Sequence, residues 1–98
     1  MSRIVTWSPE ARFDIRSILS YIGEDNPRAA LRIYERIDEM ISRLAEMPFG
    51  RKGRMGGTHE MVVTGLPYII CYRVGASEFE VARIIHGARN WPQGEWPE

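Results

Sequence analysis

The sequence has one cysteine, no net charge and no long apolar run. Cys71 is the only cysteine among 98 residues, so an internal disulfide is excluded and a reducing compartment is expected. The apolar stretches are far shorter than a membrane span, and the first residues show no charged-then-apolar signal pattern. The 13 Lys and Arg residues balance the 13 Asp and Glu residues, which argues against a protein that coats nucleic acid. These absences predict a cytoplasmic protein without a membrane partner.

Sequence motifs for cofactor and metal chemistry are also missing. The chain has no ligand spacing typical of a metal site, no phosphate-binding glycine loop and no nucleophile elbow. We therefore expect neither a cofactor nor a metal. Cys71 lies between Ile70 and Tyr72 in an apolar run, and no neighbouring residue would stabilise a thiolate. We interpret it as an inert core thiol.

The first half of the chain has the apolar spacing of two helices. Ser8-Pro9 and Asn26-Pro27 each place a capping side chain directly before a proline, which is typical of a helix start. Met47-Pro48 ends the second helix, because a residue before proline is pushed out of the helical region. The apolar stripes are Ala11, Ile15, Ile18, Leu19 and Ile22 in the first helix, and Ala30, Ile33, Ile37, Met40, Ile41 and Leu44 in the second. The pattern predicts a helical hairpin from Ser8 to about Met47.

The second half alternates short apolar runs with turn residues. A glycine- and cation-rich segment, 49–57, is interpreted as a flexible loop. Strands are predicted over 58–63, 68–74 and 79–85, and the short segment 4–7 is a β-rich start. The length of 98 residues suits a single domain, 1–98. The predicted fold class is α+β: an N-terminal strand, a helical hairpin and a three-stranded antiparallel meander, with the helices packed on one face of an antiparallel sheet.

Basic side chains gather in two places, the glycine-rich loop and the end of the last strand. Guanidinium groups suit these places because their planar fork binds carboxylates and phosphates. We predict that these residues contact a target or an antagonist protein. They are Arg51, Lys52 and Arg54 in the loop, and Arg83, His86 and Arg89 at or beyond the end of the last strand.

Several of these residues have a structural alternative. Arg83 lies in an apolar strand, so it must be paired within the chain, exposed on an uncovered sheet face, or bound to a carboxylate or phosphate of a partner. Glu60 beside His59 predicts cross-strand pairs on an exposed face, with an acid–base pair as the alternative. His86 at a strand end is more often a hydrogen-bonding surface residue than a catalyst.

The aromatic residues of the second half also allow two interpretations. Tyr68 and Tyr72 share one face by alternation, for core packing or for stacking on a partner. Trp91 and Trp96 stand beside prolines, and they are interpreted as lids over the sheet or as contacts in a complex.

Five short phrases occur in an order that resembles the ParE/RelE superfamily of bacterial toxins. They are Trp7-Ser8-Pro9-Glu10-Ala11, Asn26-Pro27 with Ala29-Ala30, Gly50-Arg51 with Gly53-Arg54, Pro67-Tyr68 with Tyr72-Arg73, and His86-Gly87-Ala88-Arg89. The resemblance covers nearly the whole chain. It implies the toxin of a type II toxin-antitoxin system, bound by a small antitoxin in a hetero-oligomer.

The two branches of that superfamily imply different targets. RelE-like members cut mRNA on the ribosome, whereas ParE-like members lack that activity and poison DNA gyrase. RelE-like nucleases usually carry an arginine after the first tyrosine of the corresponding strand, but here Ile69 follows Tyr68. Arg73 lies four residues further on, about 13 Å away at ~3.3 Å per residue, which is too far to replace that arginine. This difference favours a gyrase poison.

The nuclease alternative requires a base, an acid and cations that stabilise the developing phosphorane charge. For that alternative the candidate catalytic residues are Glu60 or His59 as the base, Arg73 or Arg83 as stabilisers, and His86 as the acid. A third possibility is a non-toxic protein-binding module with the same fold.

Overall fold

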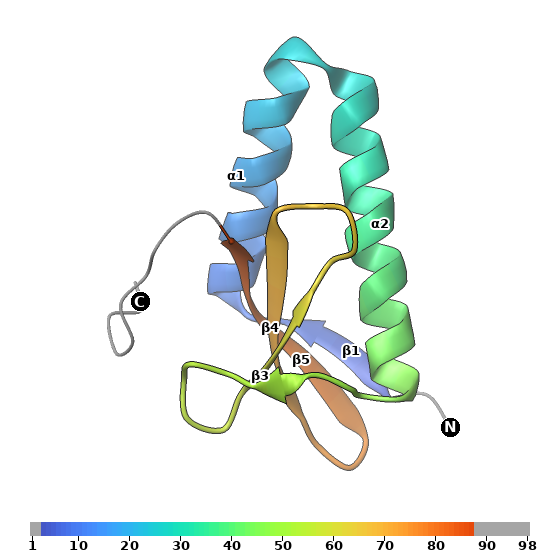
Figure 1. Cartoon of the computed structure of the whole chain (residues 1–98), viewed down its shortest axis with the longest axis vertical. Helices are drawn as coiled ribbons and strands as arrows, with labels where there is room; N and C mark the ends of the chain where they lie inside the picture. Colours follow the sequence, from blue (N-terminus) through green and yellow to red (C-terminus); the bar gives the residue numbers. More distant parts are fainter. Residues whose placement is uncertain (1–2, 88–98) are drawn as a thin grey trace.

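The computed structural model describes residues 3–87, which form two helices and a five-stranded sheet (Figure 1). In chain order the elements are β1 (Ile4–Trp7), α1 (Pro9–Asp25), α2 (Pro27–Glu46), β2 (Arg51–Lys52), β3 (His59–Val62), β4 (Tyr68–Val74) and β5 (Glu78–His86). The α+β prediction is confirmed, including the helical hairpin on one face of the sheet. Arg89, Trp91 and Trp96 lie outside the described residues.

Both helices begin at the caps that the sequence predicts. The Ser8 hydroxyl accepts the N–H of Ala11 at 3.0 Å, and the Asn26 side chain accepts the N–H of Ala29 at 3.0 Å. Asn26 also closes α1, because its own N–H donates to the carbonyl of Ile22 at 2.9 Å. One residue thus ends the first helix and starts the second, which makes the hairpin tight.

The sheet has the strand order β1-β5-β4-β3-β2, and its three central strands form the predicted antiparallel meander. The prediction of an all-antiparallel sheet was wrong, because β1 pairs with β5 in parallel. A parallel pair needs a long crossover, and the helical hairpin is part of the chain that connects β1 to the meander. The two-residue strand β2 was also missed. It pairs Arg51 with Glu60 and Lys52 with His59.

The core lies between the sheet and the helical hairpin. Tyr68, Ile70 and Tyr72 of β4 point into it, beside Phe79 of β5. The alternate residues of β4 and β5 form a second buried cluster on the other side of the sheet: Ile69, Cys71, Ala82 and Ile85. Core packing of both tyrosines is therefore confirmed, as is the buried position of the Cys71 thiol.

A β-bulge in β5 changes which of its side chains face the helices. Tyr72 pairs with Val81 and Cys71 pairs with Arg83, so Ala82 has no direct opposite in β4. The Ser8 hydroxyl donates to the carbonyl of Ala82 at 2.7 Å and ties the start of α1 to the bulge. The bulge therefore brings Arg83 onto the same side as Cys71.

Within residues 3–87, neither helix combines the length and the apolar character that a membrane crossing requires.

Candidate functional site

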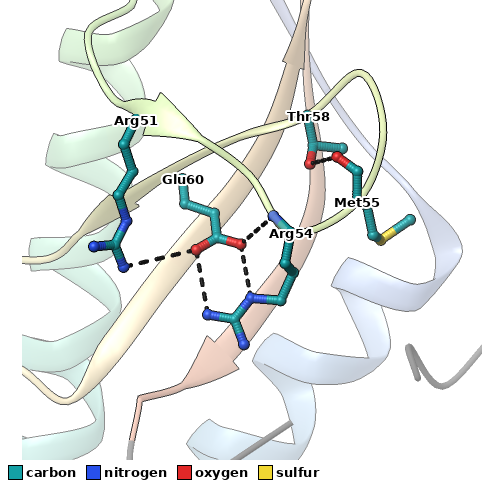
Figure 2. Close-up of polar contacts among 5 residues, drawn as sticks. All are labelled: Arg51, Arg54, Met55, Thr58 and Glu60. Atoms are coloured by element: carbon teal, nitrogen blue, oxygen red, sulfur yellow. Dashed lines mark hydrogen bonds and ion pairs between the residues drawn. The ribbon is translucent and has the colours of Figure 1, made fainter. Parts of the chain in front are cut away.

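The basic hairpin, which we define as residues 50–60, is held by the carboxylate of Glu60 (Figure 2). Glu60 Oε2 accepts the backbone N–H of Arg54 at 2.9 Å and its Nε–H at 2.8 Å. Oε1 accepts from Nη2 of the same arginine at 3.2 Å, and Nη2 of Arg51 lies 3.9 Å from Oε1. The expected cross-strand pairing is present, because Glu60 pairs with Arg51 across β2 and β3. The expected exposed face was wrong, because Glu60 is only 3% exposed.

The same contacts decide the charge of Glu60. Burial alone would raise the pKa of this carboxyl, but the hydrogen bonds and positive charge of Arg54 outweigh burial and lower the pKa below its ordinary value of 4.5. The pKa of Arg54 is raised in turn by its hydrogen bond to Glu60. Glu60 is therefore an ionised, fully engaged hydrogen-bond acceptor, which is a poor general base.

The backbone of the basic hairpin is ordered by close contacts where a flexible loop was expected. The N–H of Gly53 donates to the carbonyl of Thr58 at 2.8 Å, and the Thr58 hydroxyl donates to the carbonyl of Met55 at 2.7 Å. A side chain at Gly50 would place its Cβ 2.7 Å from the carbonyl oxygen of Glu60, where it would clash. Glycine at this position is therefore required for the approach of β2 to the sheet.

Because the pKa of Glu60 is lowered on folding, the free energy of unfolding should depend on pH through the ion pair of this residue. A lowered pKa adds stability above the unfolded-state value, and that contribution is lost as the pH falls through the folded-state value. We expect Glu60→Gln to lower the free energy of unfolding at pH 7. This deficit should shrink steadily as the pH falls below about 4. Urea unfolding of both proteins across that range measures the effect, and a deficit that stays constant with pH would contradict the assignment.

Arg83 is paired within the chain. Its Nε and Nη2 each donate at 2.8 Å to a different oxygen of Asp14 in α1, and the side chains of both residues are about nine-tenths buried. The N–H of Ile84 donates to Oδ2 of Asp14 at 3.0 Å. The pairing of β1 with β5 ends at Val81, and beyond that point the Asp14 carboxylate accepts a backbone N–H of β5 that a paired strand would otherwise accept. Of the alternatives considered for Arg83, the structure supports the internal salt bridge.

The residues considered for a nuclease do not form one set. His59, the alternative base, faces the helices as His86 does, but it pairs with Tyr72 whereas His86 pairs with Tyr68, four residues away along β4. Strand pairing and alternation place Glu60, Arg83 and Arg73 on the side of the sheet away from the helices. Arg73 donates to Glu80 at 3.0 Å in a half-exposed pair at the far end of β4. His86 pairs with Tyr68 and contacts its ring edge-on at 5.3 Å, on the helix-facing side. An acid at His86 and a base at Glu60 would therefore work on opposite faces.

The exposed cations of the basic hairpin lie on its edge strand. The side chain of Arg51 is 69% exposed, and the neighbouring Lys52 is exposed as well. Lys52 is paired with His59, whose ring stacks on Tyr72 with centroids 5.8 Å apart. Arg54 differs from both, because its side chain turns toward Glu60 and is only 21% exposed. The loop cluster predicted from the sequence thus divides into two exposed cations and one engaged cation.

A surface hollow between β1 and the helical hairpin was missed from the sequence. Its volume is about 240 Å³, and it is lined by Trp7, Arg12, Ile15, Arg16 and Tyr34. Among residues 3–87, neither of its two arginines forms an ion pair with a carboxylate. The sequence offered one signal: Arg12 and Arg16 lie one turn apart, outside the apolar stripe of α1. No local sequence pattern shows that Trp7 and Tyr34 line the same hollow in the folded chain.

The hollow adjoins an open sheet edge, since β1 is the last strand in the order. The N–H of Ile4 donates to Ser77 beside β5, so by alternation the N–H and C=O of Val5 point away from the sheet. The side chains of Ile4 and Val5 are 67% and 37% exposed. The edge can therefore accept a further strand.

The part of the chain that the structure describes contains no cluster of three metal-ligating side chains. The candidate functional features of this part are the basic hairpin, the hollow and the edge of β1.

The sequence also matches a known protein family. The model of the ParE toxin of type II toxin-antitoxin system, parDE, matches residues 5–91. The chain belongs to this family.

Two relatives of the ParE-family chain are also named as toxins. The chain is 38% identical over 90 residues to "Putative toxin Y4kP" of Sinorhizobium fredii, and the match covers 91% of this chain and 93% of that protein. It is 36% identical over 86 residues to "Toxin RelE2" of Caulobacter vibrioides, covering 87% and 96%. The ParE-family chain is thus the toxin component of a type II toxin-antitoxin system, and an antitoxin partner follows from that membership.

Solved structures show the same fold. The chromosomal ParDE TA system from P. aeruginosa superposes with a TM-score of 0.78 at 21% identity, over 87% of this chain and 96% of that one. The YoeB/ParE toxin from Agrobacterium tumefaciens superposes with a TM-score of 0.61 at 21% identity, over 85% and 96%.

Proposed function

We propose that this ParE-family toxin acts by poisoning DNA gyrase and that its antitoxin blocks it by docking beside β1. The choice of gyrase over the ribosome rests on the apolar environment of Ile69. This residue follows Tyr68, where the resemblance to RelE-like nucleases would require an arginine, and it is 8% exposed. Ile69 packs in the apolar cluster with Cys71 and Ile85. A site that must stabilise a phosphorane cannot use an apolar cluster for this purpose.

The engagement of the remaining candidate groups supports the same proposal. Glu60 is neutralised by Arg54, and Arg83 is neutralised by Asp14. RNA cleavage without a metal needs at least one acid–base pair and one available cation around a single phosphate. His86 lies on the other side of the sheet from the two arginines considered for that role. The chain therefore suits a toxin that acts by binding.

Induction in bacteria distinguishes the two targets. We expect expression of the chain to cause an SOS response and filamentation, because a trapped gyrase breaks DNA. Translation should continue at first, and transcripts should stay intact. An immediate halt in translation with cut transcripts would support ribosome-dependent mRNA cleavage instead. Harmless expression, with no small gene adjoining this one, would indicate a non-toxic binding module.

The hollow beside β1 supports the antitoxin part of the proposal. Trp7, Ile15 and Tyr34 give it an apolar floor, while Arg12 and Arg16 give it positive charge. The adjoining edge of β1 offers the backbone groups of Val5. An acidic segment with one or two large apolar side chains complements all three features, and it can fold as it adds a strand to the edge. We assign this segment to the antitoxin.

Charge reversal in the hollow tests this assignment. The double variant Arg12→Glu and Arg16→Glu should weaken antitoxin binding on the order of 10-fold or more, because it places acids opposite acids. The control is Arg28→Glu, an exposed arginine in the first turn of α2 that does not line the hollow, which should bind as the wild type does. Titration calorimetry with the purified antitoxin measures the difference. Equal affinity of both reversed proteins would place the antitoxin elsewhere.

A further inference from the structure

The basic hairpin contains more positive charge in its sequence than it offers at its surface. Arg51, Lys52 and Arg54 stand against a single acid, Glu60, between residues 50 and 60. The side chain of Arg51 is 69% exposed, whereas that of Arg54 is 21% exposed and lies against a carboxylate that is itself 4% exposed. Figure 2 shows the two arginines on different sides of the Glu60 side chain. The three cations are therefore not equivalent.

Glu60 holds Arg54 by more than charge. One carboxylate oxygen accepts both the backbone N–H and the Nε–H of Arg54, at 2.9 and 2.8 Å, and the other accepts from Nη2 at 3.2 Å. The carboxylate thus fixes the position of the main chain and the direction of the guanidinium together. A ligand phosphate that drew Arg54 outward would leave Glu60 buried without its main partner. That cost exceeds the gain from one exposed ionic contact.

We propose that Glu60 is a positioning residue that withholds Arg54 from phosphate-bearing ligands, so that Arg51 and Lys52 are the cations through which the basic hairpin binds a nucleic-acid backbone. The ligand class follows from the exposed pair. Arg51 and Lys52 point to opposite faces of the edge strand by alternation, and both side chains are exposed. A flexible strand that runs along this edge can place one phosphate near each of them. Glu60 keeps this affinity low, which suits a chain with no net charge. The inference is independent of whether gyrase is the target.

Removal of the negative charge at residue 60 tests the proposal. In Glu60→Gln the amide oxygen can still accept the N–H of Arg54, while the negative charge that holds the guanidinium against residue 60 is removed. We expect this variant to bind a labelled oligothymidylate of about 20 nucleotides roughly eightfold more tightly at ~50 mM salt, with a salt slope steeper by about 0.7. Fluorescence anisotropy over a salt series gives both values.

The control for net charge is Glu24→Gln, which makes the same change at the opposite end of the molecule, in the last turn of α1. It should stay within about twofold of the wild type. Equal gains in the two variants would overturn the proposal, because net charge would then explain them. Absence of binding by both the wild type and Glu60→Gln at low salt would overturn it as well. Restoration of the wild-type slope by adding Arg54→Gln to Glu60→Gln would support it.

A measurement on the unaltered protein keeps the proposal testable if Glu60→Gln does not fold. In ¹⁵N NMR spectra the Nε–H signal of Arg54 should be protected from exchange and should stay in place as the oligothymidylate is added. The corresponding signal of Arg51 should move. Movement of the Arg54 signal together with that of Arg51 would show that Glu60 does not withhold it.

Discussion

Replacement of Asp14 by alanine should lower the free energy of unfolding by about 3 kcal/mol. The change removes the carboxylate that binds the guanidinium of Arg83, at a site that is about nine-tenths buried. It also removes the acceptor of the Ile84 N–H, at the part of the β5 edge that β1 does not cover. Breaking such a pair from one side costs more than the pair contributes, because the remaining charge stays buried.

The exposed pair of the same sheet provides the control. Arg73 and Glu80 are 3.0 Å apart, but their side chains are 45% and 37% exposed. Glu80→Ala should therefore cost less than about 1 kcal/mol. Urea unfolding of the two variants and the wild type gives both values. If Asp14→Ala cost no more than Glu80→Ala, the buried role assigned to Arg83 would be wrong.

Phe79→Ala should have an effect of about 3–5 kcal/mol, enough to unfold a small domain in large part. Phe79 is fully buried, and its ring stacks on that of Tyr72 with centroids 4.8 Å apart. Truncation removes this contact and leaves a cavity between the sheet and the helices. Phe13→Ala is the matched control, because Phe13 is 66% exposed on α1.

Thermal unfolding followed by circular dichroism separates the two phenylalanine variants. We expect Phe13→Ala to melt within a few degrees of the wild type, and Phe79→Ala to be unfolded or to melt far lower. Comparable losses in both variants would mean that the exposed face of α1 is covered in solution, for instance by a second copy of the chain.

The helical hairpin was predictable from the sequence because its signals are local. The caps at Ser8 and Asn26 and the stop before Pro48 lie within a few residues of the groups that they satisfy. The meander was predictable for the same reason. The direction of β1 was not, because it depends on pairing with residues more than 70 positions away. Strand β2 has only two residues, too few for any periodic pattern.

The residues of the basic hairpin were predictable as a set but not as an arrangement, and the hollow beside β1 was not predictable. Alternation places Glu60 on one side of the sheet, yet it cannot show that the preceding loop folds back and brings Arg54 onto the carboxylate. The bulge at Ala82 sets the side of the sheet on which Arg83 lies, and no sequence pattern marks that bulge or the distant partner Asp14. Consequently the loss of Arg83 should reduce toxicity through instability, in contrast to the contact role first predicted.

The most direct test of the proposed target is a supercoiling assay with purified DNA gyrase and the purified toxin. We predict loss of supercoiling or accumulation of cleaved DNA held by the enzyme, with reversal when the antitoxin is added first. The same preparation should leave ribosome-bound mRNA intact. Unchanged supercoiling alongside ribosome-dependent cutting of mRNA would contradict the account.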